Sequence, residues 1–475
     1  MIALQLGVGV MMKILFVYPD IGVKGGAQSF QFGIAVLSAF LKQHGHQTDL
    51  YYMYDKYKPG KIAEKMEGFQ PELIGFSSVT PQFKYIKKIL NDVPLAKNVF
   101  TICGGPHVST EPESLQSIPR LDAICRGEGE HALLELVEAL ENKQDITKIK
   151  NLWIKKNGRV CRNPARPFIK NLDDLPFPDR ELFPYQSVID SDFGTALFMF
   201  TRGCPYNCSY CSNNALRRIQ EGKYVRFRSV DSCIEEIKGV ISNYKVKSLY
   251  FNDDIFTLNK GFVFEFCEKY KAQIHLPFDI NARVETISKE ICRELRKAGC
   301  RRINIGIESG NPYIRNEVLN RKMSNEQIVS AFSTARQAGL KTKSFNMVGF
   351  PYETSQHFQD TVKLNAEIKP DSVILNIFDP YPGTKLGDEC RSVGWIDSKR
   401  MTQELVPRTD TILNLPDFPR EKILKCYKEF AYNVYREQSL VKAVFYRIYY
   451  SSYGEQLVRI LAPFKRVLRR LTMGI

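Results

Sequence analysis

Apolar runs and helix-periodic stretches alternate along the first third of the chain. KILFVYP at 13–19 is a short apolar run typical of a buried strand, and FGIAVLSAFLKQHGHQ at 32–47 has helical spacing up to Gly45, a helix-ending glycine. Strands that alternate with helices form a parallel, doubly wound sheet. We therefore predict an α/β domain with a Rossmann-like (flavodoxin-like) fold over residues 12–144. Further strands are expected within 47–54, 72–80 and 98–109, a helix at 83–93, and a short strand with a helix within 123–140.

Small residues follow the carboxyl ends of three of these strands, at 22–26, 77–80 and 104–107. Ligands of doubly wound sheets bind at this edge. Small side chains would let a bulky ligand lie close to the main chain there. A plain nucleotide-binding or response-regulator-like domain would have the same pattern, because a fold does not determine a function.

The pattern changes at residues 145–192. LWIKKNGRVC predicts a hairpin that turns at Asn157-Gly158, and the stretch 164–184 then contains five prolines. Such a stretch forms an extended and rather rigid connection. We interpret 145–192 as an ordered linker between two domains.

A second series of strand–helix units covers residues 193–392. ALFMF, SLYFNDD, FDINARV, RRINIGIESG, KTKSFNMVGFP and SVILNIFDPYPGT are each a predicted strand, and helical patterns separate them. Six such units predict a partial (β/α)6 barrel. The active sites of barrels of this type lie at the carboxyl ends of the strands, and polar residues stand at those ends here.

Residues 393–475 are expected to be helical and basic. From Arg420 onward the chain has twelve Lys or Arg residues against four Glu, about half of its net charge of +15. EQLVRILAPFKRVLRRL, at 455–471, has the pattern of a basic amphipathic helix, which suits peripheral contact with a membrane surface and a lipid-like substrate. The alternative is a set of helices packed on the barrel with a solvated basic side.

Composition limits the remaining possibilities. The 475 residues are 44% hydrophobic and 25% charged, as in globular domains. The chain has no run of 18 or more apolar residues, and its start lacks the basic region and cleavage site of a signal peptide. We expect a cytoplasmic protein, peripheral to the inner face of the membrane if the tail binds lipid.

Three cysteines stand close together in FTRGCPYNCSYC, as Cys204, Cys208 and Cys211. A structural zinc site is the simplest interpretation, but such sites use four ligands, and no fourth cysteine or histidine follows nearby. Three thiolates leave one coordination position open, where a substrate can bind. Soft thiolate ligands also suit a 4Fe–4S cluster.

This spacing, with Tyr210 before the last cysteine, resembles the signature of the radical-SAM superfamily, and the domain order over residues 12–390 resembles its cobalamin-binding members. The resemblance implies a 4Fe–4S cluster whose free iron chelates S-adenosyl-L-methionine. Acidic residues after a strand are also frequent N-caps, and Arg283 would equally suit a structural ion pair. The predicted S-adenosylmethionine contacts are Tyr210, Asn252, Asp253, Asp254, Arg283, Glu308, Ser309, Asn346, Phe378 and Pro380.

The first domain resembles the cobalamin-binding domain in its GGPH turn and its GEGE stretch. Many such domains carry Asp-x-His-x-x-Gly after the first strand, whereas this chain has Gly22 at the histidine position. We therefore expect no histidine as the lower cobalt ligand, and His44 and His46 are expected on the surface. The predicted cobalamin contacts are Asp20, Gly22, Gly25, Ser77, Ser78, Thr80, Gly104, Gly105, His107, Gly127 and Glu128.

The resemblance implies a radical reaction on a small-molecule or lipid-like substrate, with flavodoxin or ferredoxin as electron donor. Methylation of an unactivated carbon is the first expectation, because methylating members of the family take the methyl group from cobalamin. A cobalamin-dependent cyclase or another non-methylating rearrangement would have the same domains. A non-enzymatic metal protein that contacts nucleic acid is the remaining alternative, and no nucleic acid partner is expected.

Overall fold

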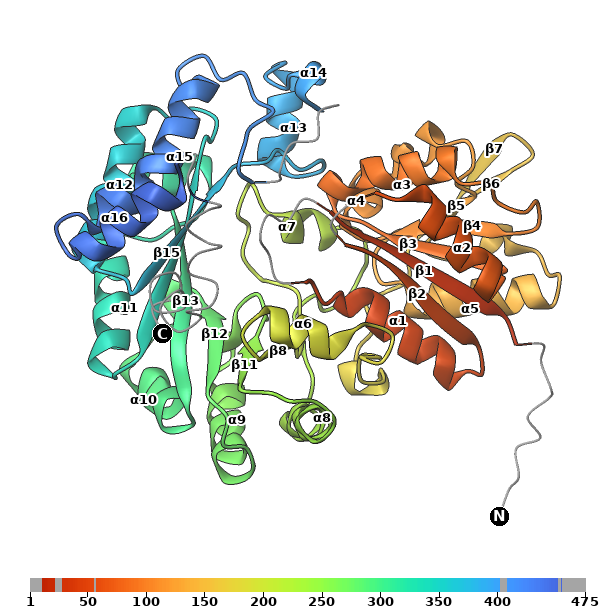
Figure 1. The fold of residues 1–475 in the computed structure, drawn as a ribbon, viewed down its shortest axis with the longest axis horizontal. Coiled ribbons are helices and arrows are strands. Elements are labelled where there is room, and N and C mark those ends of the chain that lie inside the picture. Colours follow the sequence, from red (N-terminus) through yellow and green to blue (C-terminus); the bar gives the residue numbers. More distant parts are fainter. Residues whose placement is uncertain (1–10, 22–27, 55–56, 402–407, 452–453, 455–475) are drawn as a thin grey trace. The chain divides into compact units, whose positions relative to one another are not determined.

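The computed structural model describes residues 11–21, 28–54, 57–401, 408–451 and 454. These residues fold into two units, drawn as ribbons in Figure 1. Unit 1 holds the described residues up to Phe193 together with Ser212–Arg228, and unit 2 holds Gly194–Cys211 and the described residues from Ser229 onward. The chain thus forms the cysteine loop as part of unit 2 and re-enters unit 1 directly after Cys211.

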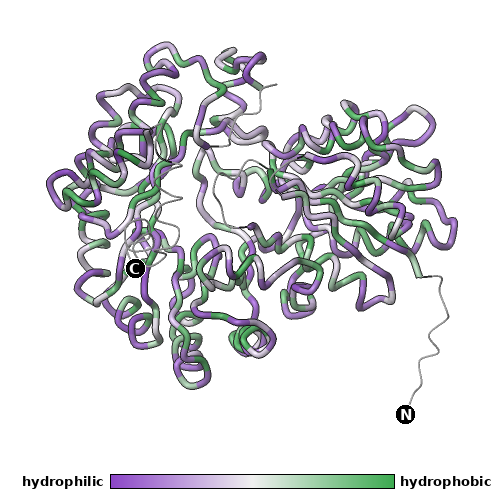
Figure 2. Tube along the Cα trace, in the orientation of Figure 1, coloured by the Kyte–Doolittle hydropathy of each residue, from purple (hydrophilic) through white to green (hydrophobic). Residues whose placement is uncertain are grey.

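Unit 1 is built on a seven-stranded sheet of order β2-β1-β3-β4-β5-β6-β7. The first five strands run parallel, and their order 2-1-3-4-5 is that of flavodoxin-like folds, so the predicted doubly wound domain is confirmed. Figure 2 colours the chain by hydropathy, and hydrophobic stretches lie within the sheet of this unit. The strands are β1 Lys13–Asp20, β2 Gln47–Tyr54, β3 Leu73–Ser77, β4 Phe100–Gly104, β5 Ala123–Cys125, β6 Leu152–Lys156 and β7 Arg159–Arg162, and a short β10 spans Arg226–Phe227.

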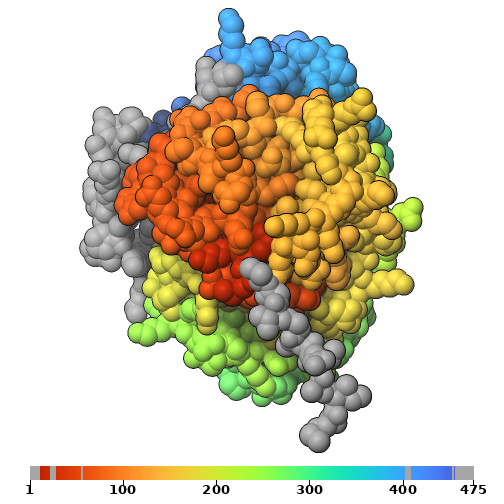
Figure 3. Space-filling model, turned by 90° about the vertical axis from the view of Figure 1, so that its right-hand side faces the viewer, coloured from red at the N-terminus to blue at the C-terminus, as the bar shows by residue number. Residues whose placement is uncertain are grey.

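The hairpin β6–β7 was expected within a linker over 145–192, but it extends the sheet of unit 1. β6 runs antiparallel to β5, with Ile154 opposite Ala123. Leu152 and Ile154 are fully buried, because alternate residues of this strand face the core. The turn forms at Asn157-Gly158, where φ is 50° and 75°, as a two-residue hairpin turn requires. Figure 3 shows this segment in yellow beside the orange elements of the same unit.

The helices of unit 1 begin and end close to the predicted positions. α1 ends at Gln43, and Gly45 has the positive φ of 87° expected of a helix-ending glycine. His44 is exposed as predicted, but the prediction for His46 was wrong, since this side chain is only 7% exposed. The helices are α1 Phe32–Gln43, α2 Pro59–Phe69, α3 Thr80–Asp92, α4 Pro106–Thr110, α5 Glu130–Glu141, α6 Tyr185–Ser191 and α7 Ser212–Leu216.

Unit 2 contains a six-stranded parallel sheet of order β15-β14-β13-β12-β11-β8, which confirms the predicted partial barrel. Its strands are β8 Thr195–Phe198, β11 Ser248–Phe251, β12 Phe278–Ala282, β13 Cys300–Glu308, β14 Lys341–Val348 and β15 Ser372–Ile377, and a short β9 spans Thr201–Arg202. The helices are α8 Val230–Asn243, α9 Lys260–Gln273, α10 Lys289–Lys297, α11 Asn325–Gln337, α12 Ser355–Ile368, α13 Lys385–Ser392, α14 Ser398–Met401, α15 Arg420–Tyr435 and α16 Leu440–Tyr449.

Each barrel helix from α8 to α12 begins at a residue whose side chain accepts a hydrogen bond from the main chain of the first turn. Ser, Thr and Asn are favoured at this position because their oxygen satisfies an N–H group that the helix leaves unpaired. The strand–helix loops therefore end at points that the sequence itself specifies. The capping residues are Ser229, Asn259, Ser288, Ser324 and Thr354.

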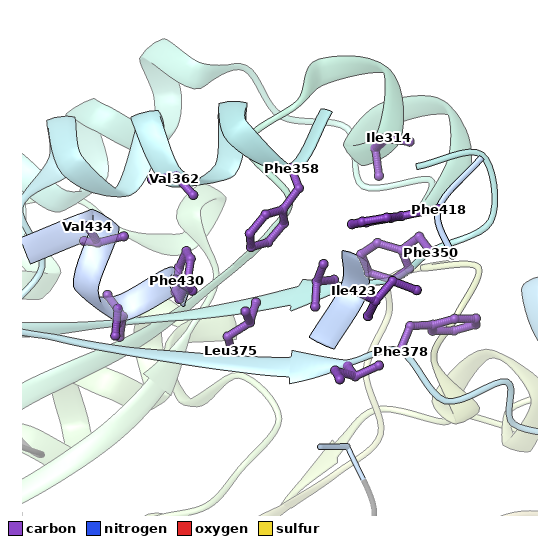
Figure 4. Packing of buried hydrophobic residues seen from close by; sticks show 14 of the residues in the cluster. Ile314, Phe350, Phe358, Val362, Leu375, Phe378, Phe418, Ile423, Phe430 and Val434 are labelled. Atoms are coloured by element: carbon purple, nitrogen blue, oxygen red, sulfur yellow. The ribbon is translucent and has the colours of Figure 1, made fainter. Parts of the chain in front are cut away.

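The C-terminal helices α15 and α16 pack on the barrel. Phe430 and Val434 of α15 meet Phe358 and Val362 of α12 in the hydrophobic cluster of Figure 4, next to Leu375 of β15. Residues of α16 are buried in the same cluster. For α15 and α16 the structure thus supports the alternative of helices packed on the barrel, while the basic stretch 455–471 lies outside the described residues. In the part of the chain that the structure describes, no helix is long and apolar enough to cross a membrane.

Candidate active site

The three cysteines lie in one loop directly after β9. Cys208 is buried, whereas Cys204 and Cys211 are partly exposed, and the N–H of Cys211 donates to the carbonyl of Cys208 at 3.2 Å. Among the described residues, no three His, Cys, Asp or Glu side chains converge on a single ion. Three thiolates within one loop are the ligand set of a 4Fe–4S cluster, in which each thiolate binds a different iron.

Asp253 holds the chain just before the cysteine loop. Its Oδ1 accepts hydrogen bonds from the N–H groups of Phe200 and Thr201 at 2.8 and 2.7 Å, and from the Thr201 hydroxyl at 2.7 Å. The side chain is completely buried, and Oδ2 has no hydrogen-bond partner among the described residues. Burial raises the pKa of Asp253 to about 6. Asp253, which was predicted to contact S-adenosylmethionine, therefore has a structural role. Its side chain neither caps a helix nor stands as a free carboxylate.

Asn252 and Asp254 flank Asp253 and are exposed at the end of β11. The carboxylate of Asp254 lies near Cys204, whose pKa is raised by burial and also by this negative charge. A carboxylate next to a ligand cysteine is well placed for the ammonium group of S-adenosylmethionine. Asp254 thus remains a predicted contact of S-adenosylmethionine, and its position near Cys204 supports this prediction.

Arg283, at the end of β12, is 5% exposed and already has protein partners. It forms an ion pair with Glu285 at 2.7 Å, lies 3.6 Å from the centre of the Tyr206 ring, and donates from Nη1 to Cys208 Sγ at 3.4 Å. The structural ion pair that the sequence left open is present. Arg283 supports the cysteine loop through these contacts.

Glu308 ends β13 and Ser309 follows it, and the two residues differ in accessibility. Glu308 has a φ of 67°, a side chain 12% exposed and a hydrogen bond to Tyr210. Burial raises the pKa of Glu308, and Arg321 opposes this shift. Ser309 is fully buried, and its hydroxyl accepts from the N–H of Asn311 at 3.2 Å. Glu308 remains the predicted contact of the ribose, whereas Ser309 shapes the turn.

Asn346 was predicted to line the adenosine pocket, but its side chain has partners on a neighbouring helix. Successive residues of a strand point to opposite sides, and this parity directs Asn346 toward α12. Its amide exchanges hydrogen bonds with Asn365, including one of 2.8 Å, and the side chain is fully buried. Phe378 and Pro380 are also buried, and Phe378 packs 5.3 Å from Phe350 in the core beneath Tyr210.

Several residues of this site escaped the sequence analysis. Arg321 approaches Cys208, and Tyr206 and Glu285 hold Arg283. At the end of β15, Asp379 lies near Arg408, and burial raises the pKa of Asp379 to about 6. No pattern in the sequence links these residues, although Asp379 follows a predicted strand directly, as Asp253 does.

In unit 1, Asp20 at the end of β1 binds Ser29 and Tyr52. Its carboxylate accepts from the N–H of Ser29 at 3.0 Å and from the hydroxyl of Tyr52 at 2.5 Å. Burial and this carboxylate together raise the pKa of Tyr52. Asp20 thus links the end of β1 to Ser29, and the predicted contacts Gly22 and Gly25 lie outside the described residues.

The ends of β3 and β4 form the second predicted cobalamin loop. Gly105 has a φ of 98°, and a Cβ atom there would lie 2.7 Å from the carbonyl oxygen of Ser78, so glycine is required for packing of the protein itself. His107 is buried, with Nδ1 3.2 Å from the Thr80 hydroxyl and its ring 4.2 Å from that of Phe83. Ser77 and Gly104 are partly exposed at this edge and remain predicted contacts.

Gly127 and Glu128 bind the segment that follows the cysteine loop. Arg226 forms a bidentate ion pair with Glu128 at 2.8 and 3.0 Å, and the N–H of Glu128 donates to Gln220 at 2.8 Å. A Cβ atom at Gly127 would lie 2.2 Å from the Gln220 side chain. α7 also contacts α4, the GGPH helix. Glu128 therefore anchors Ser212–Arg228 to unit 1.

Comparisons with known proteins agree with this architecture. Residues 198–364 match the family model of the radical SAM superfamily, and residues 19–137 match that of the B12 binding domain. The uncharacterized methyltransferase PH0819 of Pyrococcus horikoshii is 30% identical over 444 residues, which cover 91% of this chain and 95% of that protein. An anaerobic magnesium-protoporphyrin IX monomethyl ester cyclase of Cereibacter sphaeroides is 28% identical over 400 residues, which cover 80% of this chain and 64% of the cyclase.

Among solved structures, the radical S-adenosylmethionine methyltransferase TsrM of Kitasatospora setae, with cobalamin and a [4Fe-4S] cluster bound, has the same fold at a TM-score of 0.66. Its sequence identity is 16%, and the match covers 81% of this chain and 78% of TsrM. The cobalamin-dependent enzyme OxsB matches at a TM-score of 0.63 over 90% of this chain and 62% of OxsB. From its sequence relatives and both family models, this chain belongs to the radical SAM superfamily and carries an N-terminal B12-binding domain.

Proposed function

We propose that this protein is a cobalamin-dependent radical SAM methyltransferase that methylates an unactivated carbon of a small-molecule or lipid-like substrate. The observation that carries the proposal is the return of the chain to unit 1 directly after Cys211. The loop that would hold the cluster is therefore continuous with a segment anchored on Glu128, next to the predicted cobalamin loops. The name of the relative from Pyrococcus horikoshii supports methyl transfer.

When bound, the cluster with S-adenosylmethionine supplies a radical that abstracts hydrogen, and cobalamin supplies the methyl group. Cys204, Cys208 and Cys211 would hold the cluster. Asp254 would bind the ammonium group of S-adenosylmethionine, and Glu308 would bind its ribose hydroxyls. Glu308, only 12% exposed, and the partly buried Tyr210 would help to keep water from the bound ligand.

The loop after β1 would hold cobalamin without a histidine ligand, because Asp20 is followed by Ile-Gly rather than by a histidine at the expected position. His107 is occupied by Thr80 and Phe83, so it is not free to take that role. Neither the stretch 20–25 nor His107 would then supply a histidine ligand to the cofactor. A cytoplasmic location and an electron donor such as flavodoxin or ferredoxin complete the proposal.

A cyclase reaction is the second candidate, because the Cereibacter sphaeroides relative carries that name at 28% identity. The two reactions differ in what they release from S-adenosylmethionine. A methyltransferase that remethylates cobalamin forms S-adenosylhomocysteine, whereas a cyclase forms 5′-deoxyadenosine alone.

The test uses protein reconstituted anaerobically with iron, sulfide and cobalamin, then reduced and given S-adenosylmethionine with a deuterated methyl group. We expect S-adenosylhomocysteine in amounts comparable to the protein, and deuterated methyl on cobalamin, even without substrate. The Cys211→Ala variant is the control, since it should still form S-adenosylhomocysteine but no 5′-deoxyadenosine. Release of 5′-deoxyadenosine without S-adenosylhomocysteine would refute the methyltransferase and favour the cyclase.

A further inference from the structure

A segment between β13 and α11 forms hydrogen bonds with the cysteine loop. We call Ile314–Arg321 the cluster-loop clamp. Ser209, between the second and third cysteines, donates from its N–H to the Leu319 carbonyl at 3.0 Å and from its hydroxyl to the Val318 carbonyl at 2.6 Å. Asn320 donates from Nδ2 to the Asn207 carbonyl at 2.9 Å. Both residues that flank Cys208 are therefore tied to the clamp.

The clamp has an uncommon backbone. Ile314–Val318 form a π-helix, and Asn320 has a φ of 49°. π-Helical turns and left-handed residues are rare and gather at functional sites, because the surrounding structure must hold them. Here the helix ends early, and the carbonyls of Val318 and Leu319 become free to accept from Ser209.

Arg321 ends the clamp and turns its guanidinium to the buried cysteine. Nη1 lies 3.8 Å from Cys208 Sγ, Nη2 donates to the Gly306 carbonyl, and the side chain is 5% exposed. Its Nε has no hydrogen-bond partner among the described residues. A Cβ atom at residue 306 would lie 2.8 Å from Nη2, so the glycine there makes room for this guanidinium.

The guanidinium groups of Arg283 and Arg321 thus both approach Cys208 Sγ, but nearby carboxylates neutralise their charges to different extents. Arg283 lies 3.4 Å from Cys208 Sγ and is paired with Glu285 at 2.7 Å. Among the described residues, Arg321 has one ion pair, with Glu308 at 3.9 Å. Arg321 is therefore the less neutralised cation beside Cys208.

We propose that Arg321 tunes the reduction potential of the cluster through the Cys208 thiolate, while the clamp keeps the cluster in its loop. This inference rests on the proposed function, since it requires a 4Fe–4S cluster at the three cysteines. One-electron reduction adds a negative charge to the cluster, and an N–H donor and a positive charge at a ligand sulfur stabilise the reduced form. Arg321 is a positioning residue, because it acts through Cys208.

The test is a redox titration of the reconstituted holoenzyme, followed by the electron paramagnetic resonance of the reduced cluster before S-adenosylmethionine is added. Arg321→Met should lower the equilibrium constant for reduction at least tenfold, which corresponds to about 59 mV for one electron. Arg321→Lys keeps the charge and should restore most of this loss. Equal potentials in the wild type, Arg321→Met and Arg321→Lys would overturn the proposal.

Asn320→Ala is the matched variant for the clamp, since it removes a contact to the loop without changing charge. It should release iron to a chelator several-fold faster than the wild type and leave the potential unchanged. Unchanged iron release would overturn the role of the clamp. If Arg321→Met binds no cluster, Arg321→Gln takes its place in the titration. Equal reduction potentials of Arg321→Gln and Arg321→Lys would then refute the proposal that Arg321 tunes the cluster. Absence of a cluster in the wild type would instead refute the proposed function.

Discussion

Replacing Asp253 by asparagine should stabilise unit 2 in a pH-dependent way. Asp253 is completely buried, with three hydrogen bonds to Oδ1 and none to Oδ2 among the described residues. Burial raises its pKa from 3.8 to about 6. The folded state therefore holds a proton that the unfolded state releases, so stability falls as the pH rises from about 4 to about 6.

The size of this effect follows from the shift in the pKa of Asp253. At about 1.4 kcal/mol for each unit of pKa, the change corresponds to about 3 kcal/mol. Asparagine resembles the protonated acid and does not titrate. The difference in stability between Asp253→Asn and the wild type should therefore grow by about 3 kcal/mol between pH 4 and pH 7.5, whatever its value at pH 4.

The assay is urea unfolding followed by tryptophan fluorescence. The chain has two tryptophans, so a Trp153→Phe background leaves Trp395 as the reporter of unit 2. Asn252→Ala is the control, because this exposed neighbour does not titrate and the difference should not change with pH. A constant difference between Asp253→Asn and the wild type across this pH range would show that the buried acid is ionised without cost, and the reasoning would fail.

Three further predictions concern the other parts of the protein. Glu128→Gln leaves Arg226 buried without its charge partner and should destabilise unit 1 by about 3–5 kcal/mol, measured by urea unfolding with Trp153 as the reporter, and an unchanged midpoint would contradict the buried pair. Gly105→Ala should destabilise the same unit by about 1–3 kcal/mol and weaken cobalamin binding, measured by absorbance titration, whereas wild-type binding would refute the close approach at this turn. Cys211→Ala should lose most of its reconstituted iron, measured by colorimetric assay, while Cys426→Ser should keep it, and equal iron contents would contradict the three-cysteine site.

The order of strands and helices could be predicted from the sequence because each element carries its own signal. Period-two and apolar runs identify the strands, and Ser, Thr or Asn residues precede the barrel helices. The pairing of β6 with β5 could not be predicted in the same way. A hairpin pattern states that two strands pair with each other and leaves open which sheet their edge joins.

The candidate site could be predicted where its chemistry depends on the spacing of residues along the sequence, as for the three cysteines. It was harder to predict where the chemistry depends on the direction in which a side chain points. Asn346 lies on a correctly predicted strand, yet its side chain points to Asn365 on α12. Arg321 lies thirteen residues after Glu308, beyond a π-helix that no periodic pattern marks. Side-chain direction and irregular turns are set by tertiary contacts, which a single sequence does not display.

Acids with raised pKa values follow three of the barrel strands. Asp253 follows β11, Glu353 follows β14 and Asp379 follows β15, and burial raises their pKa values to about 6, about 8 and about 6. Each acid lowers the free energy of unfolding as the pH rises from its ordinary pKa toward its raised pKa. At neutral pH the barrel is therefore less stable than it would be with apolar residues at these positions. Asp253 and Glu353 each accept hydrogen bonds from main-chain N–H groups that follow a barrel strand. These two carboxylates therefore hold these segments in place at a cost in stability near neutral pH, and titratable groups perturbed in this way are typical of functional sites.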